Sequence, residues 1–213
     1  MKEDNKGFWD KWAHWYDKAM LLDRNTYAQI IDRMKTTLTK EMTVLELACG
    51  TGLISTQIAG SVKMLEASDF SKEMIQQAKK KPHSSQLHFS VQNAANLPYV
   101  PETFDAAIIS NALHIMPEPE KVLLEIARVL RPGGILIAPT FTMSDTFFGR
   151  LRMRIMELCG FQAFHKWTSG AFLSYLSEHG FTVTKSDIIG KSARLTYAQA
   201  VKTEIKPQHS CSA

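Results

Sequence analysis

The chain has 213 residues, 45% of them hydrophobic, and a formal net charge of +4, which suits one domain with a sizeable core and is too short for two. No apolar run approaches the ~20 residues of a membrane span, and the start of the chain shows no signal peptide. The three cysteines form no CxxC pair that would indicate a disulfide framework or a zinc site, so we expect a soluble, cytoplasmic protein in a reducing compartment.

The first element along the chain is an unusually aromatic stretch, residues 8–17. Phe8, Trp12, Trp15 and Tyr16 have spacings that are compatible with one face of a helix. We expect most of these rings to pack on the domain. The sequence therefore predicts a helix at the N-terminus that contacts the core through aromatic side chains.

Residues 43–52 are the most informative stretch, because an apolar strand runs into a loop of small residues. Ala48, Gly50 and Gly52 allow the backbone to turn sharply and to approach a ligand closely. Strand, small-residue turn and helix in this order are typical of a doubly wound nucleotide-binding sheet. Turns of this kind also serve as tight connections, and that alternative stays open on the loop alone.

The loop differs from the fingerprint of dinucleotide-binding proteins in two ways. Glu46 stands at the end of the strand, and the spacing from Ala48 to Gly52 is not G-x-G-x-x-G. A carboxylate would repel phosphate but can accept a hydrogen bond from an amine or ammonium. No Lys follows the glycines, which excludes a Walker-type site, so we expect a ligand with a positive group near Glu46.

A second predicted strand, residues 63–69, ends at Asp69, which lies 69 − 50 = 19 positions beyond Gly50. In doubly wound folds an acid about 20 residues beyond the loop binds the ribose hydroxyls. The alternative is that Asp69 caps a helix that starts at Ser71. The loop makes the ribose interpretation the stronger one.

The rest of the chain continues the alternation of strands and helices. Alternation of this kind predicts parallel strands joined by right-handed crossovers. Thr168 can cap a helix over 168–179 and Gly180 can end it. The further strands are expected at 87–91, 104–110 and 134–141, followed by a hairpin of 181–186 and 193–201 and a frayed tail over 203–213.

Several segments resemble the class I S-adenosylmethionine-dependent methyltransferases. Residues 46–52, Glu-Leu-Ala-Cys-Gly-Thr-Gly, and 68–74, Ser-Asp-Phe-Ser-Lys-Glu-Met, are similar to the first two motifs of that family. Residues 92–99 resemble the segment that brackets adenine, 104–110 the fourth strand and 130–134 the turn before the fifth. The ordered motifs cover roughly Val44 to Pro139, and the small-molecule branch that includes quinone-biosynthesis methyltransferases is the most similar.

The resemblance implies an α/β fold, a doubly wound, Rossmann-like, mostly parallel sheet with a C-terminal antiparallel strand pair and an N-terminal helical lid. It implies S-adenosylmethionine as cofactor and S-adenosylhomocysteine as product. The residues that would contact the cofactor are Tyr16, Glu46, Ala48, Gly50, Gly52, Asp69, Phe70, Met74, Asn93, Ala94 and Ser110. Within one domain, we expect a lid over 1–40, a cofactor-binding core over 41–141, a substrate-capping insertion over 142–167, a helix and hairpin over 168–202 and a tail over 203–213.

The sequence departs from the family pattern at two positions. Ala48 stands where Gly is usual, and its methyl group still permits close packing. Asn93 stands where Asp is usual, and its carbonyl oxygen can still accept a hydrogen bond from the adenine amino group. We therefore expect cofactor binding to be retained.

The substrate should be set by the regions outside the sheet. The family often uses an N-terminal helix with a Tyr-Asp pair as a lid, which points to Tyr16. The insertion is expected above the same pocket, where its apolar side chains would line a cavity for an apolar small molecule. These side chains are Met153, Ile155, Met156 and Phe161.

The implied chemistry is an in-line displacement in which a nucleophile of the acceptor attacks the sulfonium methyl group. A general base is needed only if the nucleophile must lose a proton. The best-placed candidate is His114, just past strand four, and the alternative is a partly buried histidine bonded to a backbone carbonyl. His14 and His165 flank the same expected pocket and are weaker candidates.

Other functions remain as alternatives. These are a module that binds S-adenosylmethionine without catalysis, an NAD-type oxidoreductase, which Glu46 disfavours, and an RNA methyltransferase, which lacks its usual motif after strand four. No clustered metal ligands or converging thiols indicate a metal-dependent or arsenite methyltransferase. The basic runs at 79–81 and 150–154 are short and separate, so we expect a small-molecule partner and no nucleic acid. The oligomeric state and the acceptor atom stay open.

Overall fold

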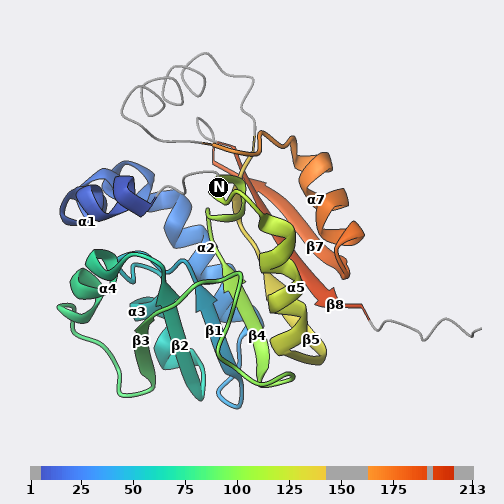
Figure 1. The fold of residues 1–213 in the computed structure, drawn as a ribbon, viewed down its shortest axis with the longest axis horizontal. Coiled ribbons are helices and arrows are strands. Elements are labelled where there is room, and N and C mark those ends of the chain that lie inside the picture. Colours follow the sequence, from blue (N-terminus) through green and yellow to red (C-terminus); the bar gives the residue numbers. More distant parts are fainter. Residues whose placement is uncertain (1–5, 143–162, 191–193, 204–213) are drawn as a thin grey trace, which may run out of the picture.

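The computed structural model describes residues 6–142, 163–190 and 194–203. Its eight strands form one sheet in the order β3-β2-β1-β4-β5-β8-β6, and β7 also pairs with β8 (Figure 1). The strands are β1 Thr43–Leu47, β2 Met64–Asp69, β3 Leu87–Val91, β4 Phe104–Ile109, β5 Leu130–Ile137, β6 Thr140–Phe141, β7 Phe181–Ile189 and β8 Leu195–Lys202.

The pairing of the strands confirms the predicted fold class. β1, β2, β3, β4 and β5 pair in parallel, and β8 runs antiparallel to β5, β6 and β7. The order reverses at β1, because β2 lies on one side of it and β4 on the other. In open α/β sheets, ligands bind beyond the carboxyl ends of the strands at such a switch point.

Helices cover both faces of the sheet. Alternate residues of β1 face opposite layers: Val44 packs in one core with Ile58 of α3, and Leu45 packs in the other with Leu123 of α5. The helices are α1 Lys6–Met20, α2 Arg24–Thr37, α3 Ser55–Ile58, α4 Lys72–Lys79, α5 Pro119–Val129 and α7 Ser169–Glu178, with 3-10 turns η1 Leu21–Asp23, η2 Ala59–Ser61 and η3 Leu113–Ile115.

The fifth strand differs from its predicted range. It begins at Leu130 rather than 134, because Leu130 pairs with Phe104 before a bulge shifts the register. It also breaks before Pro139, which has no N–H to donate to a neighbouring strand. The carbonyl of Pro139 instead accepts a hydrogen bond of 2.7 Å from the backbone N–H of Asn111. The short strand β6 continues after this break.

The C-terminal helix and hairpin form where the sequence predicts them, but β7 extends to Ile189 rather than 186, and β8 begins at Leu195 rather than 193. The hydroxyl of Thr168 accepts a hydrogen bond of 3.2 Å from the backbone N–H of Ala171, which caps α7. Gly180 follows the helix with a φ of 88°, a conformation that suits glycine. The hairpin of β7 and β8 then closes the sheet.

Some predictions fall outside the described residues. They include the four apolar side chains of the insertion, the arginines at 150–154 and most of the tail. Of the basic run 79–81, Lys79 and Lys80 are exposed, whereas Lys81 makes an ion pair with Asp17. Across the described ranges, no helix is long and apolar enough to cross a membrane.

Candidate active site

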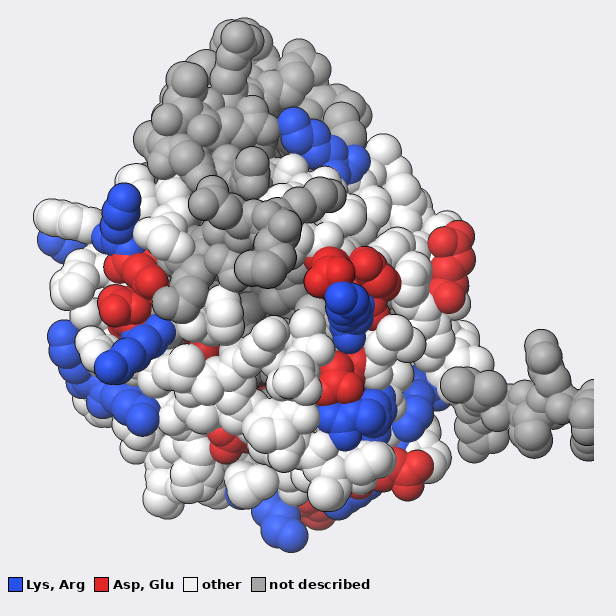
Figure 2. Space-filling view, in the orientation of Figure 1, with Lys and Arg blue, Asp and Glu red and all other residues white. Residues whose placement is uncertain are grey.

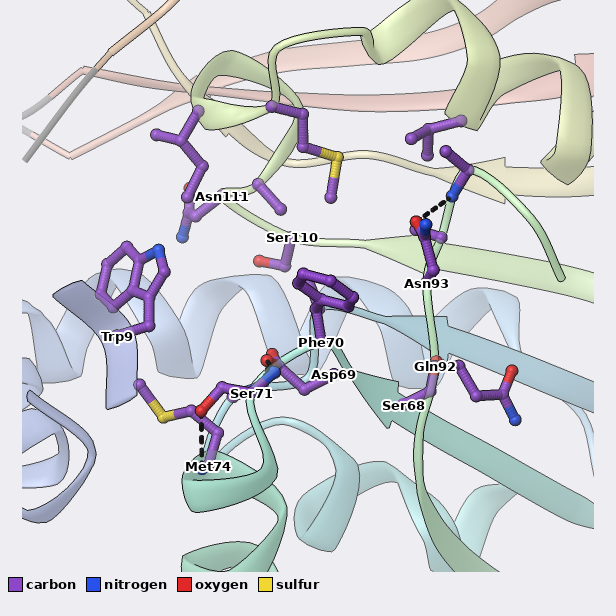
Figure 3. A pocket seen from close by; sticks show the side chains of 18 of the residues that line it. Trp9, Ser68, Asp69, Phe70, Ser71, Met74, Gln92, Asn93, Ser110 and Asn111 are labelled. Atoms are coloured by element: carbon purple, nitrogen blue, oxygen red, sulfur yellow. Dashed lines mark hydrogen bonds between the residues drawn. The ribbon is translucent and has the colours of Figure 1, made fainter. Parts of the chain in front are cut away.

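A cavity of about 440 Å³ lies at the carboxyl ends of the parallel strands, next to the switch point at β1. Its walls come from the loops after β1, β2, β3 and β4 and from one face of α1. Figure 3 shows the side chains of this cavity, with Asp69 and Phe70 on one side and Ser110 and Asn111 facing them. The cavity thus occupies the position predicted from the small-residue loop.

The loop after β1 owes its shape to three residues with positive φ. Ala48, Gly50 and Gly52 have φ values of 53°, 55° and 74°. A Cβ atom on Gly50 would lie 3.7 Å from Tyr16, whereas one on Gly52 would lie 2.8 Å from Phe89, too close to fit. Gly52 is therefore required for packing. Ala48 carries a strain of ~1 kcal/mol, since left-handed backbone is unfavourable for residues with a Cβ atom.

Asp69 joins the ends of two strands. Its Oδ2 atom accepts a hydrogen bond of 2.8 Å from the backbone N–H of Gly50, and its Oδ1 atom accepts one of 2.9 Å from the N–H of Ser71. The cap of α4 is Ser71 itself, whose hydroxyl accepts from the N–H of Met74. Each carboxylate oxygen has a second lone pair that can accept a ligand hydroxyl. Burial raises the pKa of Asp69, while the bonds from Ser71 and Gly50 act in the opposite direction.

The loops after β2 and β3 form the side of the cavity next to Asp69. Phe70 is 43% exposed and presents its ring to the cavity, with Met74 beside it. Asn93 and Ala94 line the same side. The Oδ1 atom of Asn93 already accepts a hydrogen bond of 2.9 Å from the backbone N–H of Ala95 (Figure 3). This bond fixes the amide, and one lone pair of the oxygen remains for a ligand donor.

Helix α1 covers the cavity with a face other than the one expected. Trp9 and Tyr16, which are seven residues apart, line the cavity, and Ala13 between them is buried. Trp12 and Trp15 are 38% and 60% exposed, so the predicted common face with Tyr16 is wrong. Burial and the neighbouring Tyr27 raise the pKa of the Tyr16 hydroxyl well above its ordinary value.

Polar contacts attach α1 to the rest of the site. Asp10 accepts a hydrogen bond from the hydroxyl of Ser71, and Asp17 accepts one from the hydroxyl of Thr51 in the loop after β1. Asp17 also forms an ion pair of 2.7 Å with Lys81. These bonds connect the helix to both segments that Asp69 joins.

Glu46 lies beneath the loop and is not among the residues that line the cavity. It is 1% exposed, and its Oε2 atom has no hydrogen-bond partner. Burial raises the pKa of Glu46 to about 8; the nearby Ser55 hydroxyl acts against the shift, and Asp69 adds to it. The carboxyl is therefore largely protonated at neutral pH. Cys49, in the loop that follows, is also buried.

The segment after β4 supplies the wall opposite Asp69. Ser110 and Asn111 line it, and Asn111 has a φ of 54°, in the left-handed region. Its amide nitrogen donates to the hydroxyl of Tyr27 at 3.3 Å, which ties this wall to α2. Strained backbone of this kind is concentrated at functional sites.

The three candidate histidines lie behind or outside the cavity wall. His114 is 5% exposed, its Nδ1 atom has no partner, and its backbone carbonyl accepts a bond of 3.0 Å from the N–H of His165. Burial and His165 lower the pKa of His114 to about 4, so its ring is neutral at physiological pH. His165 stacks on Trp167, and His14 contacts Gln77 on the exposed side of α1.

The described lining is acidic and otherwise uncharged. Asp69 and Glu118 are its only carboxylates, and no Lys or Arg belongs to it. A cavity with this composition favours a cationic ligand and disfavours phosphates. Nowhere in the described ranges do three or more His, Cys, Asp or Glu residues gather as metal ligands.

The structure brings most of the predicted site residues together. The lining includes Tyr16, Ala48, Gly50, Asp69, Phe70, Met74, Asn93, Ala94 and Ser110. It does not include Glu46, Gly52 or His114. Lining residues that sequence reasoning missed include Trp9, Gln92, Asn111, Met116 and Glu118. Gln92 and Asn111 directly adjoin Asn93 and Ser110, so their positions after the strands were a usable signal.

Comparison with known sequences identifies the central part of the chain. Residues 45–138 match a family described as a methyltransferase domain. The chain is 36% identical over 100 residues to a demethylmenaquinone methyltransferase of Clavibacter sepedonicus. The aligned region covers 46% of this chain and 41% of the relative. The chain therefore matches less than half the length of this curated relative.

Solved structures share the fold over most of the chain. The methyltransferase in a complex with the Haloferax volcanii Trm112 methyltransferase activator has a TM-score of 0.78 and 20% identity, covering 95% of this chain and all of that one. Magnesium protoporphyrin IX methyltransferase from Synechocystis, with bound SAH, has a TM-score of 0.66 and 18% identity, covering 85% of this chain and 84% of that one. At this identity, the similarity establishes the fold alone.

Proposed function

We propose that the chain is an S-adenosylmethionine-dependent methyltransferase, like the family that its central part matches and the relatives it resembles, and that it transfers a methyl group to a small-molecule acceptor. The observation that carries the proposal is the cavity at the switch point, where Asp69 is fixed between two strand ends and no Lys or Arg lines the walls. S-adenosylmethionine carries a sulfonium and an ammonium group, which match this acidic lining.

The residues present fit this cofactor. The remaining lone pairs of Asp69 would accept from the ribose hydroxyls, and Phe70 and Asn93 would hold the adenine. Ala48 and Gly50 would leave room for close approach of the backbone, and Ser110 would face the methionyl part. Glu46 would act on the ligand through the loop above it, because its carboxyl is buried out of reach of the cavity.

When bound, S-adenosylmethionine would supply an activated methyl group on sulfur, and its transfer leaves S-adenosylhomocysteine. The main task of this chain would be to hold the acceptor in line with that methyl group, an effect worth up to ~7 to 11 kcal/mol. Trp9 and Tyr16 would cover the cavity and exclude water.

The proposal also includes a division of the chain into functional segments. These are a lid over 1–40, a core over 41–141, a capping insertion over 142–167, a helix and hairpin over 168–202 and a tail over 203–213.

His114 is our candidate for a general base. Its neutral ring and its unpartnered Nδ1 atom support this role. Ala112 and Ile115, on either side of it in the chain, line the cavity. A small rotation of the segment after β4 would be needed to bring the imidazole to an acceptor, and acceptors that carry no proton on the nucleophile would not need it.

The acceptor class is proposed from the relatives. Those with significant similarity include several demethylmenaquinone methyltransferases, so quinols are the first acceptors to test, followed by simple phenols and amines. Transfer of an isotope-labelled methyl group from S-adenosylmethionine to one of these compounds, detected by mass spectrometry, would identify the acceptor.

Calorimetry tests the cofactor site before any acceptor is known. We expect S-adenosylhomocysteine to bind the purified chain and NAD not to bind, because the lining has no cation for a pyrophosphate. Binding of NAD in preference would contradict the proposal. If neither ligand binds, the cavity can no longer be assigned as a cofactor site.

A further inference from the structure

The outer face of α1 and η1 exposes large apolar side chains. Trp15 and Leu21 are 60% and 66% exposed, and Trp12 is 38% exposed. In α1, the step of about 100° per residue places Trp15 on the side of the helix away from Ala13, which is buried against the domain. Exposed rings of this size on adjacent turns are unusual for a surface that faces only water.

The same face is basic. Lys11 and Lys18 are exposed on α1, and the Nζ atom of Lys18 lies 4.7 Å from the centre of the Trp15 ring. Arg24 is exposed at the start of α2, directly after η1. In Figure 2 basic side chains lie at the edge of the molecule where Figure 1 places α1, with acidic side chains next to them on the side towards α4. The surface thus combines aromatic rings with positive charge.

The acids of this segment are engaged elsewhere. Asp10 accepts a hydrogen bond from Ser71, Asp17 forms an ion pair with Lys81, and Asp23 is buried. Asp10 and Asp17 are therefore directed towards the loops of the site, away from Trp15 and Lys18. The separation gives one helix an inner polar side and an outer basic, aromatic side.

We propose that the face formed by Lys11, Trp12, Trp15, Lys18, Leu21 and Arg24, which we call the basic aromatic face, docks on a lipid bilayer with anionic headgroups. Indole rings favour the boundary between headgroups and acyl chains. Lysine side chains extend from an apolar surface towards phosphates, and each basic residue near an anionic surface adds to the attraction. Helices with these two properties lie in the plane of the interface.

The position of the helix gives this docking a consequence for the cavity. Trp9 and Tyr16, on the inner side of α1, form a wall of the cavity, while the basic aromatic face is on the outer side. A docked helix would place the covered end of the cavity next to the bilayer. An apolar acceptor dissolved in the bilayer would then have a short path to the site. The docking itself does not depend on the proposed methyl transfer.

Sedimentation with vesicles tests the proposal on the full chain. We expect binding to phosphatidylcholine vesicles that contain phosphatidylglycerol, weak binding to phosphatidylcholine alone, and a blue shift of tryptophan emission on the anionic vesicles. The pair Lys11→Glu and Lys18→Glu should weaken binding at least about tenfold, since each reversed charge acts near the surface. The pair Trp12→Ala and Trp15→Ala should remove the blue shift and most of the binding.

Matched controls use exposed residues away from α1. Leu124→Ala, on α5, removes another exposed apolar side chain, and Lys185→Glu reverses an exposed charge on β7; neither should change vesicle binding. A circular dichroism spectrum equal to that of the parent would show that each variant is folded. Equal loss in the controls, no binding to anionic vesicles, or binding to RNA instead would overturn the proposal, whereas failure of S-adenosylhomocysteine to bind would bear only on the methyltransferase site.

Discussion

Two of the walls of the cavity are built in different ways. The strand-end wall consists of the loops after β1 and β2. They are joined by a backbone hydrogen bond from the N–H of Cys49 to the carbonyl of Ser68 and by a bond from the backbone N–H of Gly50 to the carboxylate of Asp69. The helix wall consists of α1, which is attached through side chains such as Asp17. Backbone geometry therefore fixes the first wall, while the second depends on a few exposed polar contacts, and we expect cofactor affinity to depend far more on the first.

The largest effect is expected for Asp69→Ala, which removes a charged acceptor from the strand-end wall. Two hydrogen bonds to a carboxylate are worth enough to weaken S-adenosylhomocysteine binding at least about 100-fold. Calorimetry measures the change, with Asp69→Asn as the matched variant that keeps one acceptor and should lose less. An affinity within about threefold of the parent would remove Asp69 from the cofactor site.

The substitution Glu46→Gln tests whether the buried carboxyl of Glu46, in the strand that precedes the same wall, is protonated in the folded protein. Burial raises the pKa of Glu46 to about 8 from 4.5, so the folded state keeps a proton that the unfolded chain releases. The stability from this proton is present below about pH 4.5 and is lost as pH rises towards about pH 8. The parent should therefore lose about 2 kcal/mol of unfolding free energy between about pH 6.5 and about pH 8 through this group.

Urea unfolding at both pH values measures this loss, and Glu46→Gln should remove most of it. Burial lowers the pKa of His114 to about 4, whereas an unfolded imidazole titrates near about 6.5, so His114 still takes up a proton on unfolding in the lower part of this window. This contribution is common to parent and variant and cancels in their difference. An equal pH dependence in parent and variant would show that Glu46 is ionised in the folded protein.

His114→Ala separates chemistry from binding. With an acceptor that must lose a proton, turnover should fall at least about tenfold, and cofactor affinity should be nearly unchanged. Steady-state rates and calorimetry on the same preparation measure the two quantities, and His114→Gln serves as the variant that retains a polar side chain. Unchanged turnover would exclude His114 from the mechanism.

The smallest effect is expected for Asp17→Asn in the helix wall. The variant loses the ion pair with Lys81, which is partly exposed and therefore weak, so S-adenosylhomocysteine affinity should fall by about threefold. Asp187→Asn, which breaks the exposed ion pair with Arg33 far from the cavity, should leave affinity unchanged. A loss as large as that of Asp69→Ala would show that the two walls contribute equally.

The difference between the walls also explains what could be predicted from sequence. The strands and the small-residue loop follow from local signals. Gly50 allows the backbone to turn and to approach a ligand closely, and an acid at the end of β2 is typical of doubly wound folds that bind a ribose. Capping by Thr168 and termination at Gly180 are equally local. These features do not depend on how distant parts of the chain pack.

The missed features depend on packing. An aromatic helix such as α1 offers more than one apolar face, and the spacing of Trp12, Trp15 and Tyr16 is as regular as that of Trp9 and Tyr16. Only the small Ala13 side chain allows close contact with the domain on the observed side. Glu46 lies in a strand buried on both faces, so alternation gives no sign that its carboxyl points away from the ligand.

The position of β8 constrains how the protein folds as it is synthesised. β8 pairs with β5 and β6 on one side and β7 on the other, although residues 195–202 follow all of these strands in the chain. The parallel strands can pair while translation continues, but β5 keeps an open edge until these residues leave the ribosome. Unpaired edges favour aggregation, so a nascent chain halted before β8 should need chaperone protection that the released chain does not.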